Sequence, residues 1–213
     1  MTSRWGPLGW ATLHSVSLLY PENPSSLEIQ LLRRWIASFN DTIVCPSCME
    51  HFRETRTRYE REHPGVYSSR KEFCLFILRA HNSVNRRTAK HEYTLDETVA
   101  ELHRILPPER ASAKRVEYLQ YIRRQWSLDR GLSGVSALGK LRELQMTEQQ
   151  YWSVRGAPDW TSMLELLQGE SVEPLVEKPA DSSSPIRTLT NAIAMPTFSL
   201  FKHTKGRLSL LHR

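Results

Sequence analysis

The sequence predicts an all-α protein, and three observations support this fold class. Apolar residues recur at helical spacing in the segment before the first cysteine, at Leu27, Leu31, Leu32, Trp35, Ile36 and Phe39. The segments "MEHFRETRTRYEREHPG" and "SRKEFCLFILRAHNSVNRRTAKHEY" also have helical patterns, the first charged and the second strongly apolar. No strand–helix–strand pattern surrounds the cysteines, which argues against a thioredoxin-like fold in this region.

The first predicted helix carries an indole and an imidazole on one face. In "RWGPLGWATLHSVSLLYP", the residues at spacing i, i+3, i+4 and i+7 are Trp10, Leu13, His14 and Ser17, and the helix ends before Pro21. Because Trp10 and His14 lie one turn apart, together they can hold a planar ring. A core tryptophan beside a hydrogen-bonded histidine explains the same pattern, so this helix alone leaves both interpretations open.

A single CxxC pair, Cys45 and Cys48, follows the second predicted helix. Two cysteines at this spacing can close a small disulfide, and a helix N-terminus stabilises the attacking thiolate. The same spacing also supplies half of a zinc site, for which His51 and His63 would be the remaining ligands. That arrangement, C-x2-C-x2-H-x11-H, matches no common zinc-finger spacing. The pair therefore favours redox chemistry, with a metal site as the alternative.

The fourth predicted helix is an apolar run that ends in polar and cationic residues. Its hydrogen-bonding side chains at the mouth of the bundle are His81, Asn82 and Asn85, with Val84 as an apolar contact. Positive charge suited to a pyrophosphate comes from Arg86, Arg87 and Lys90. Cations are also favoured at any helix C-terminus, so these residues alone do not decide between ligand binding and helix capping.

Three segments together resemble a known family. The segments "WGPLGWATLH", "CPSCMEHF" and "HNSVNRRTAKHEY" are similar, in order and spacing, to the signature segments of the Erv/ALR sulfhydryl oxidases, and the first looks most like the viral members. The resemblance covers about residues 4–106. It implies a four-helix bundle with a short fifth helix, which binds FAD non-covalently beside the CxxC pair.

The resemblance also implies a role for individual residues. The cofactor contacts it implies are Trp5, Gly6 and Pro7 in a closing loop, Trp10 and His14 on the first helix, Cys48 and His51 on the third, and His81, Asn82, Val84, Asn85, Lys90 and Tyr93 on and after the fourth. Cys45 would exchange with a substrate dithiol, and Cys48 would pass the electron pair to the flavin. Dioxygen would then accept the electrons and leave as hydrogen peroxide.

Cysteine usage departs from many cellular members of the family. This chain has neither a second, shuttle cysteine pair nor a stapling disulfide, and the third cysteine, Cys74, lies inside an apolar helical run. We expect Cys74 to be a small buried hydrophobe. Cys45 would then meet a protein dithiol directly or through a separate thioredoxin-like relay, and we expect a homodimer. The alternative is a non-enzymatic helical binding module with the CxxC pair in a metal site.

Residues 107–213 lie beyond the resemblance. After Pro107 and Pro108, three segments have helical patterns, and the first carries an apolar stripe at Val116, Leu119, Tyr121, Ile122 and Trp126. We expect this stripe to pack on the preceding helices. The predicted organisation is an FAD-binding oxidase domain over 1–106, a helical annex over 107–169, and a linker with a basic tail over 170–213.

Charge and composition limit the class of partner. Residues 187–213 hold five of the 29 lysines and arginines and none of the 23 acids. With the interleaved leucines and phenylalanines, this tail can contact an anionic membrane surface, but its charges are too few and dispersed to indicate nucleic-acid binding. We see no secretory signal, and the apolar runs are too short to span a bilayer. A viral protein of this kind would act in the host cytoplasm or the virion.

Overall fold

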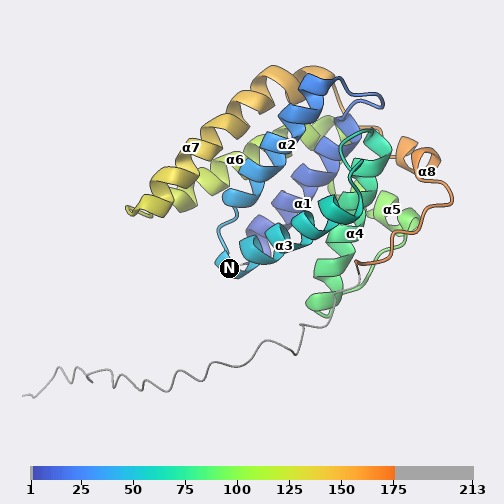
Figure 1. Ribbon diagram of the computed structural model, residues 1–213, viewed down its shortest axis with the longest axis horizontal. Coiled ribbons are helices and arrows are strands. Elements are labelled where there is room, and N and C mark those ends of the chain that lie inside the picture. Colours follow the sequence, from blue (N-terminus) through green and yellow to red (C-terminus); the bar gives the residue numbers. More distant parts are fainter. Residues whose placement is uncertain (1, 176–213) are drawn as a thin grey trace, which may run out of the picture. The chain divides into compact units, whose positions relative to one another are not determined.

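Four helices form the centre of the protein, as the sequence predicts. The computed structural model describes residues 2–175, and their side chains from Trp5 onward. The central helices are α1 (Thr2–Leu19), α2 (Ser26–Asp41), α3 (Pro46–Glu62) and α4 (Arg70–Arg87), and α5 (Leu95–Ile105) is the short fifth helix. Helix α1 packs against α4, and α3 contacts both α2 and α4 (Figure 1). Every regular element over residues 2–175 is helical, which confirms the predicted all-α fold.

Local side-chain contacts explain where these helices begin. Ser25 forms a capping box with Glu28 at the start of α2, and Thr94 does the same with Glu97 at α5. The hydroxyl of Ser69 accepts from a backbone N–H in the first turn of α4. At α3 the N-cap residue is Cys45, followed by a proline in the first turn. The second cysteine of the CxxC pair therefore lies in the first turn of a helix.

The annex forms two long helices and several short ones. They are the 3₁₀ helix η1 (Pro108–Arg110), α6 (Ala111–Trp126), α7 (Leu132–Thr147), the π-helix η2 (Glu148–Trp152), the 3₁₀ helix η3 (Ser153–Arg155) and α8 (Ser162–Leu166). Helix α6 lies along α1, α7 packs on α2 and α6, and α8 contacts α5 (Figure 1). The residues Met1–Glu177 form one compact unit. The annex thus packs on the preceding helices, as expected from its apolar stripe.

The buried face of α6 differs from the predicted stripe. Leu119 and Ile122 are buried as expected, but Val116 is 38% exposed and Tyr118 is fully buried. The face toward α1 also includes Arg115, which is 0% exposed. The predicted stripe is therefore correct at Leu119 and Ile122 and wrong at Val116, whose place on the buried face is taken by Arg115, a residue that apolar spacing does not predict to be buried.

A buried ion pair within the annex is hydrogen-bonded to α1. Arg115 Nε donates to both carboxylate oxygens of Glu148 at 3.1 and 2.9 Å, and its Nη1 donates to Ser15 Oγ at 2.6 Å. Ser153 donates a further hydrogen bond to Glu148. Removing one partner of such a pair leaves an uncompensated buried charge. Because Arg115 also donates to Ser15, this network favours one position of α6 on α1.

Residues 170–175, predicted as the start of a linker, are bound along α4. Lys71 Nζ pairs with Glu170 at 2.6 Å, and Arg79 Nε donates to Ser171 O at 3.0 Å. Farther along, Leu175 N donates to Ser83 Oγ at 2.9 Å. We call residues 170–175 the strap. The basic tail that follows lies outside the described residues, so its membrane contact stays a prediction.

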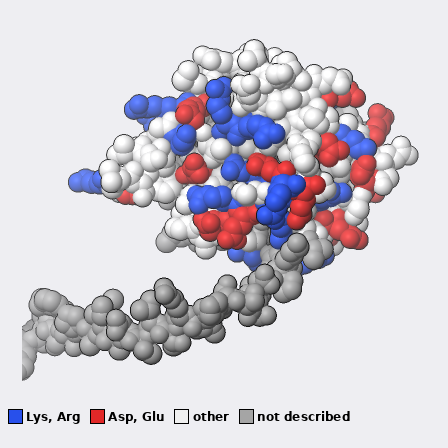
Figure 2. All heavy atoms as spheres, in the orientation of Figure 1, with Lys and Arg blue, Asp and Glu red and all other residues white. Residues whose placement is uncertain are grey.

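Exposed charges contribute less to this fold than the core does. On the face drawn in Figure 2, basic and acidic side chains are intermixed over the described helices. Several pair within one helical turn, such as Arg104 with Glu101 and Lys114 with Glu117. Exposed pairs of this kind are each worth about 0.2–1 kcal/mol. None of the described helices is long and apolar enough to cross a membrane.

Candidate functional site

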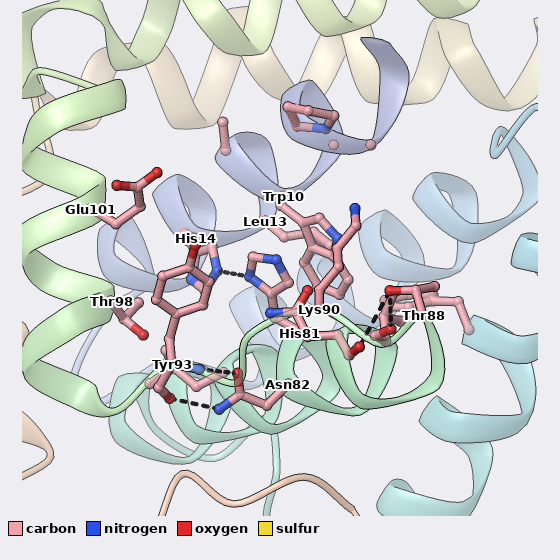
Figure 3. Close-up of a pocket in the computed structure, with 18 of the residues that line it drawn as sticks. Trp10, Leu13, His14, His81, Asn82, Thr88, Lys90, Tyr93, Thr98 and Glu101 are labelled. Carbon is pink, nitrogen blue, oxygen red and sulfur yellow. Dashed lines mark hydrogen bonds between the residues drawn. The ribbon is translucent and has the colours of Figure 1, made fainter. Parts of the chain in front are cut away.

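A cavity of about 550 Å³ lies among α1, α4, α5 and the start of α3. Its volume falls in the range of small-molecule and cofactor sites, and its wall is mainly apolar with a few polar groups. The structure brings most of the predicted site residues to this wall, namely Trp5, Gly6, Pro7, Trp10, His14, Cys48, His81, Asn82, Val84, Asn85, Lys90 and Tyr93. Figure 3 labels Trp10, His14, His81, Asn82, Lys90 and Tyr93 among the lining residues. Two predicted residues, Cys45 and His51, are not among those that line it.

Trp10 and His14 reach the cavity from the same face of α1. The ring of Trp10 stacks on His81 from α4, with centroids 4.1 Å apart and planes 12° apart. His14 Nε2 lies 3.0 Å from His81 Nδ1, as Figure 3 shows. Both side chains line the cavity, and His14 is also buried and hydrogen-bonded as the core interpretation expects, so that these two residues hold a planar ring stays a prediction.

Asn82 connects three segments at the cavity wall. Its side-chain oxygen accepts from Tyr93 N at 2.9 Å, and its Nδ2 donates to Tyr93 O at 2.8 Å (Figure 3). The same Nδ2 donates to Val172 O of the strap at 2.9 Å. Both amide hydrogens are therefore used by backbone carbonyls, so Asn82 positions the Tyr93 segment and the strap on α4.

Three polar atoms of the wall are buried without a hydrogen-bond partner: Trp5 Nε1, His14 Nδ1 and Asn85 Nδ2. Buried polar groups in native proteins are nearly always hydrogen-bonded. A heteroatom-rich ligand in the cavity would provide such partners, and the aromatic rings of the wall would offer it flat apolar surface.

Burial keeps the two histidines of the wall neutral. It lowers the pKa of His14 from 6.5 to about 4, and His14 is 2% exposed. Burial also lowers the pKa of His81 well below its usual value, with smaller contributions from electrostatic interaction with His14 and with the positive charge of Lys90. At neutral pH, therefore, each ring offers one N–H donor and one acceptor.

These pKa shifts predict acid sensitivity. Because the folded state holds His14 with a pKa of about 4, the unfolded state binds protons first as the pH falls below 6.5. The contribution of neutral His14 to the free energy of unfolding is fully present above pH 6.5. It is lost as the pH falls from about 6.5 to 4, by up to about 3 kcal/mol. We expect His14→Gln to flatten the melting temperature against pH in this window. Replacement of the exposed His103 by glutamine is the control. The prediction is contradicted if the melting temperature depends equally on pH in the wild type, His14→Gln and His103→Gln.

The cysteine pair lies at the cavity with its two sulfurs in different surroundings. Cys45 and Cys48 form a disulfide, and Cys48 lines the cavity whereas Cys45 does not. As N-cap of α3, Cys45 accepts a hydrogen bond at its sulfur from Cys48 N at 3.3 Å. A helix N-terminus and an N–H donor both favour the thiolate form of a cysteine in this position.

The cationic residues at and after the end of α4 have two different surroundings. Arg87 and Lys90 line the cavity, with Thr88 and His91 beside them. Arg86 instead makes two hydrogen bonds to Glu92, at 2.8 and 2.9 Å. Two positive side chains thus remain at the wall for an anionic group of a ligand.

Sequence reasoning missed the wall contributed by α5. The other residues that line the cavity are Gly9, Ala11, Leu13, Phe39, Ile43, Phe52, Leu78, Arg87, Thr88, His91, Thr98, Glu101, Leu102 and Ile105. Among these, Thr98, Leu102 and Ile105 recur at i, i+4 and i+7, a pattern that was readable in the sequence. Most of the others lie beside motif residues and carry no chemical signature of their own.

The residues of the alternative zinc site are not brought together. His63 stacks on Tyr59 at the C-terminal end of α3, with centroids 4.1 Å apart. Within residues 5–175, no group of three or more His, Cys, Asp or Glu side chains is arranged to hold a metal ion. The predicted approach of His51 to a cofactor stays a prediction.

Cys74 is buried in a separate part of the core. It is 0% exposed on α4, among apolar residues that include Leu75, Leu78 and Trp160. Burial raises the pKa of its thiol to about 12. A neutral thiol without solvent access is unreactive at physiological pH, in agreement with the expected packing role.

Comparisons with known proteins identify similar chains. The sequence model of the Erv1 / Alr family matches residues 8–104. A protein of Invertebrate iridescent virus 6 named as an FAD-linked sulfhydryl oxidase is 31% identical over 89 residues, which cover 40% of this chain and 80% of that protein. The FAD-linked sulfhydryl oxidase of African swine fever virus is 28% identical over 86 residues, 40% of this chain and 69% of that protein.

A cellular protein is similar over the same part of the chain. The mitochondrial FAD-linked sulfhydryl oxidase of Schizosaccharomyces pombe is 32% identical over 81 residues, which cover 38% of this chain and 43% of that protein. No solved structure gives a significant match. The similarity therefore includes both viral and cellular proteins.

Proposed function

This chain belongs to the Erv1 / Alr family and is a flavin-linked thiol oxidase with FAD as its cofactor, and from this premise we propose that it forms disulfides in protein dithiols and delivers the electrons to dioxygen. One observation carries the proposal. A disulfide at a helix N-terminus has one sulfur, that of Cys48, on the wall of a cavity sized for a cofactor. The other cysteine, Cys45, does not line the cavity, and both cysteines are partly exposed residues.

The two positions assign different roles to the cysteines. A substrate thiolate attacks the sulfur of Cys45, the Cys45–Cys48 bond breaks, and Cys48 leaves as a thiolate facing the cavity. The second substrate thiolate then attacks the mixed disulfide, which releases the oxidised substrate and the Cys45 thiolate. The Cys48 N–H and the α3 N-terminus stabilise that thiolate.

FAD bound in the cavity supplies the two-electron acceptor that returns the cysteine pair to the disulfide, with dioxygen as the final acceptor and hydrogen peroxide as the product. The residues that would hold it include Trp10 and His14, whose rings stand at the wall, and Asn85, whose amide is otherwise unpartnered. Arg87 and Lys90 would neutralise the pyrophosphate.

The test is spectroscopic and kinetic. Purified protein should be yellow with one FAD per chain, and a small dithiol should drive oxygen uptake with equimolar hydrogen peroxide. Colourless protein with bound zinc would overturn the proposal and favour the alternative, a helical binding module with the cysteines in a metal site.

The physiological substrate and the assembly are also proposals. A protein dithiol meets Cys45 directly or through a thioredoxin-like relay, and the enzyme acts as a homodimer. The Cys48→Ser variant should capture the partner in its oxidised form: the Cys45 thiolate attacks the partner's disulfide, one partner sulfur leaves as a thiolate, and Cys48 is absent to release the mixed disulfide from Cys45. Light scattering on the purified full chain tests the dimer.

Asn85→Ala should weaken FAD binding. Its side-chain amide is buried at the wall without a protein partner, so its loss should remove a ligand hydrogen bond, about 0.5–1.5 kcal/mol or roughly 2- to 13-fold in affinity. The melting temperature should fall and recover with added FAD, because the ligand stabilises only the folded state. Asn40→Ala is the matched control, since Asn40 is equally buried but does not line the cavity. Equal FAD content and equal recovery in both variants would contradict the assignment.

Cys74→Ala should remain fully active on a small dithiol and on a protein substrate. The buried thiol should contribute only packing, so we expect a loss of about 1 kcal/mol in the free energy of unfolding from a small cavity. Urea denaturation measures this cost. A variant that still oxidises the small dithiol but not the protein substrate would show that Cys74 relays electrons.

A further inference from the structure

The last residue of α6 contacts the chain just before the CxxC pair. Trp126 Nε1 donates to Thr42 O at 2.9 Å. Thr42 is the C-cap of α2, where helix carbonyls lack partners within their own helix. Only Ile43 and Val44 separate it from Cys45, so the annex binds the redox pair's own connecting loop.

Other contacts on the same face of α6 fix this end of α2. Tyr118, two turns before Trp126, stacks on Phe39 with centroids 5.1 Å apart and planes 21° apart. Between them Ile122 is fully buried. Phe39 in turn accepts the hydroxyl hydrogen bond of Thr42 at 2.8 Å through its carbonyl. The loop therefore starts from a surface built jointly by α2 and α6.

The loop transmits that position directly to the site. Ile43 lines the cavity and Cys45 is the N-cap of α3, where its sulfur meets the N–H of Cys48. A two-residue connection between a buried carbonyl and an N-cap has little freedom to absorb a shift. Any displacement of Thr42 changes how the Cys45 sulfur faces the helix N-terminus.

We infer that Trp126 is a positioning residue of the redox pair: its indole N–H fixes the Thr42–Cys45 loop so that the α3 N-terminus stabilises the Cys45 thiolate. The inference builds on the proposed function. Without this hydrogen bond the loop loosens, the thiolate loses part of its stabilisation, and Cys45 becomes less reactive at neutral pH. The role belongs to a residue outside the part of the chain that the family model covers.

The chain offers a matched control for the lost hydrogen bond. Trp160 Nε1 also donates to a backbone carbonyl, that of Leu106, at 2.7 Å, and Trp160 is fully buried. It packs in the second core cluster, with α5 and α8 residues, and does not line the cavity. W126F and W160F each remove one indole–carbonyl hydrogen bond, but only the first is next to the CxxC loop.

The experiment measures Cys45 alone, in the full chain carrying Cys48→Ser. In this background we expect W126F to lower the rate of Cys45 alkylation by iodoacetamide at pH 7 by about 2- to 10-fold, the effect of losing one neutral hydrogen bond. The midpoint of the plot of alkylation rate against pH should move upward. W160F should leave both unchanged, although its melting temperature falls at least as much. In chains that keep Cys48, only W126F should lower kcat/KM for a dithiol.

The outcomes separate this inference from the proposed function. Equal alkylation profiles in W126F and W160F, beside a wild type that binds FAD and consumes oxygen, would overturn the positioning role alone. A wild type without FAD or dithiol-driven oxygen uptake would overturn the proposed function, and the alkylation profiles would still decide the role of Trp126. Should W126F not fold, W126M against W160M provides the same comparison.

Discussion

Replacing Cys48 by serine is expected to abolish thiol oxidation while FAD stays bound. Cys48 is the cysteine on the cavity wall, whereas the residues expected to grip the cofactor are rings and amides of α1 and α4. Without the inner sulfur, the pair cannot form a disulfide, so turnover should fall to background with both small dithiols and proteins. FAD content by absorbance and oxygen uptake with a dithiol measure the two effects separately.

Cys45→Ser provides the complementary result. It should also abolish turnover, because the partly exposed sulfur that substrates attack is gone. The Cys48 thiolate then remains unpaired at the cavity and should give a long-wavelength absorption band with bound FAD. The same band in Cys48→Ser, and not in Cys45→Ser, would reverse the assignment of the two cysteines.

Much of the site was predictable because its residues are concentrated in three short motifs. Each motif lies on one helix or at a helix start, where spacing determines which side chains share a face. Trp10 with His14, and His81 with Asn85, therefore reached the cavity wall as expected. The chemistry of the CxxC pair likewise depends on a local feature, the N-terminus of α3.

What could not be predicted depends on contacts between distant parts of the chain. Asn82 lines the cavity, but the motif does not predict that its amide hydrogens go to Tyr93 O and to Val172 O, 90 residues away. Arg115 can lie in the core because Glu148 and Ser15 accept hydrogen bonds from its Nε and Nη1, and the residue spacing of α6 does not predict those partners. The spacing of apolar residues predicts which apolar side chains are buried, but it cannot predict that a charged side chain is buried as well.

The annex and the strap therefore contact the site-forming segments at three points. Arg115 holds Ser15, the neighbour of His14 on α1. Trp126 holds the loop before Cys45, and the strap holds Asn82, the neighbour of His81 on α4. The three segments that carry the motifs are each fixed by a residue from the second half of the described chain. Whether the oxidase works without that half becomes a direct structural question.

The fragment that ends at Leu106 is not expected to be a soluble, FAD-loaded oxidase, although it contains all three motifs. The cut removes α6 and α7, which cover one face of α1 and α2, and it leaves Ser15 without Arg115. Trp35, 5% exposed in the intact chain, loses its edge-to-face contact with Trp152, and Phe39 loses Tyr118. A contiguous apolar face of this kind causes association or aggregation in water.

Truncation after Glu177 is the matched control, because it keeps every described contact, including the strap on α4. We expect this variant to match the full chain in FAD content, melting temperature and dithiol-driven oxygen uptake. The 1–106 fragment should instead be insoluble or self-associated in size-exclusion chromatography, with low FAD content. If the 1–106 fragment equals the full chain in solubility, FAD content and activity, then the contacts of Arg115, Trp126 and the strap contribute nothing to the site. The family motifs alone would then suffice to build it.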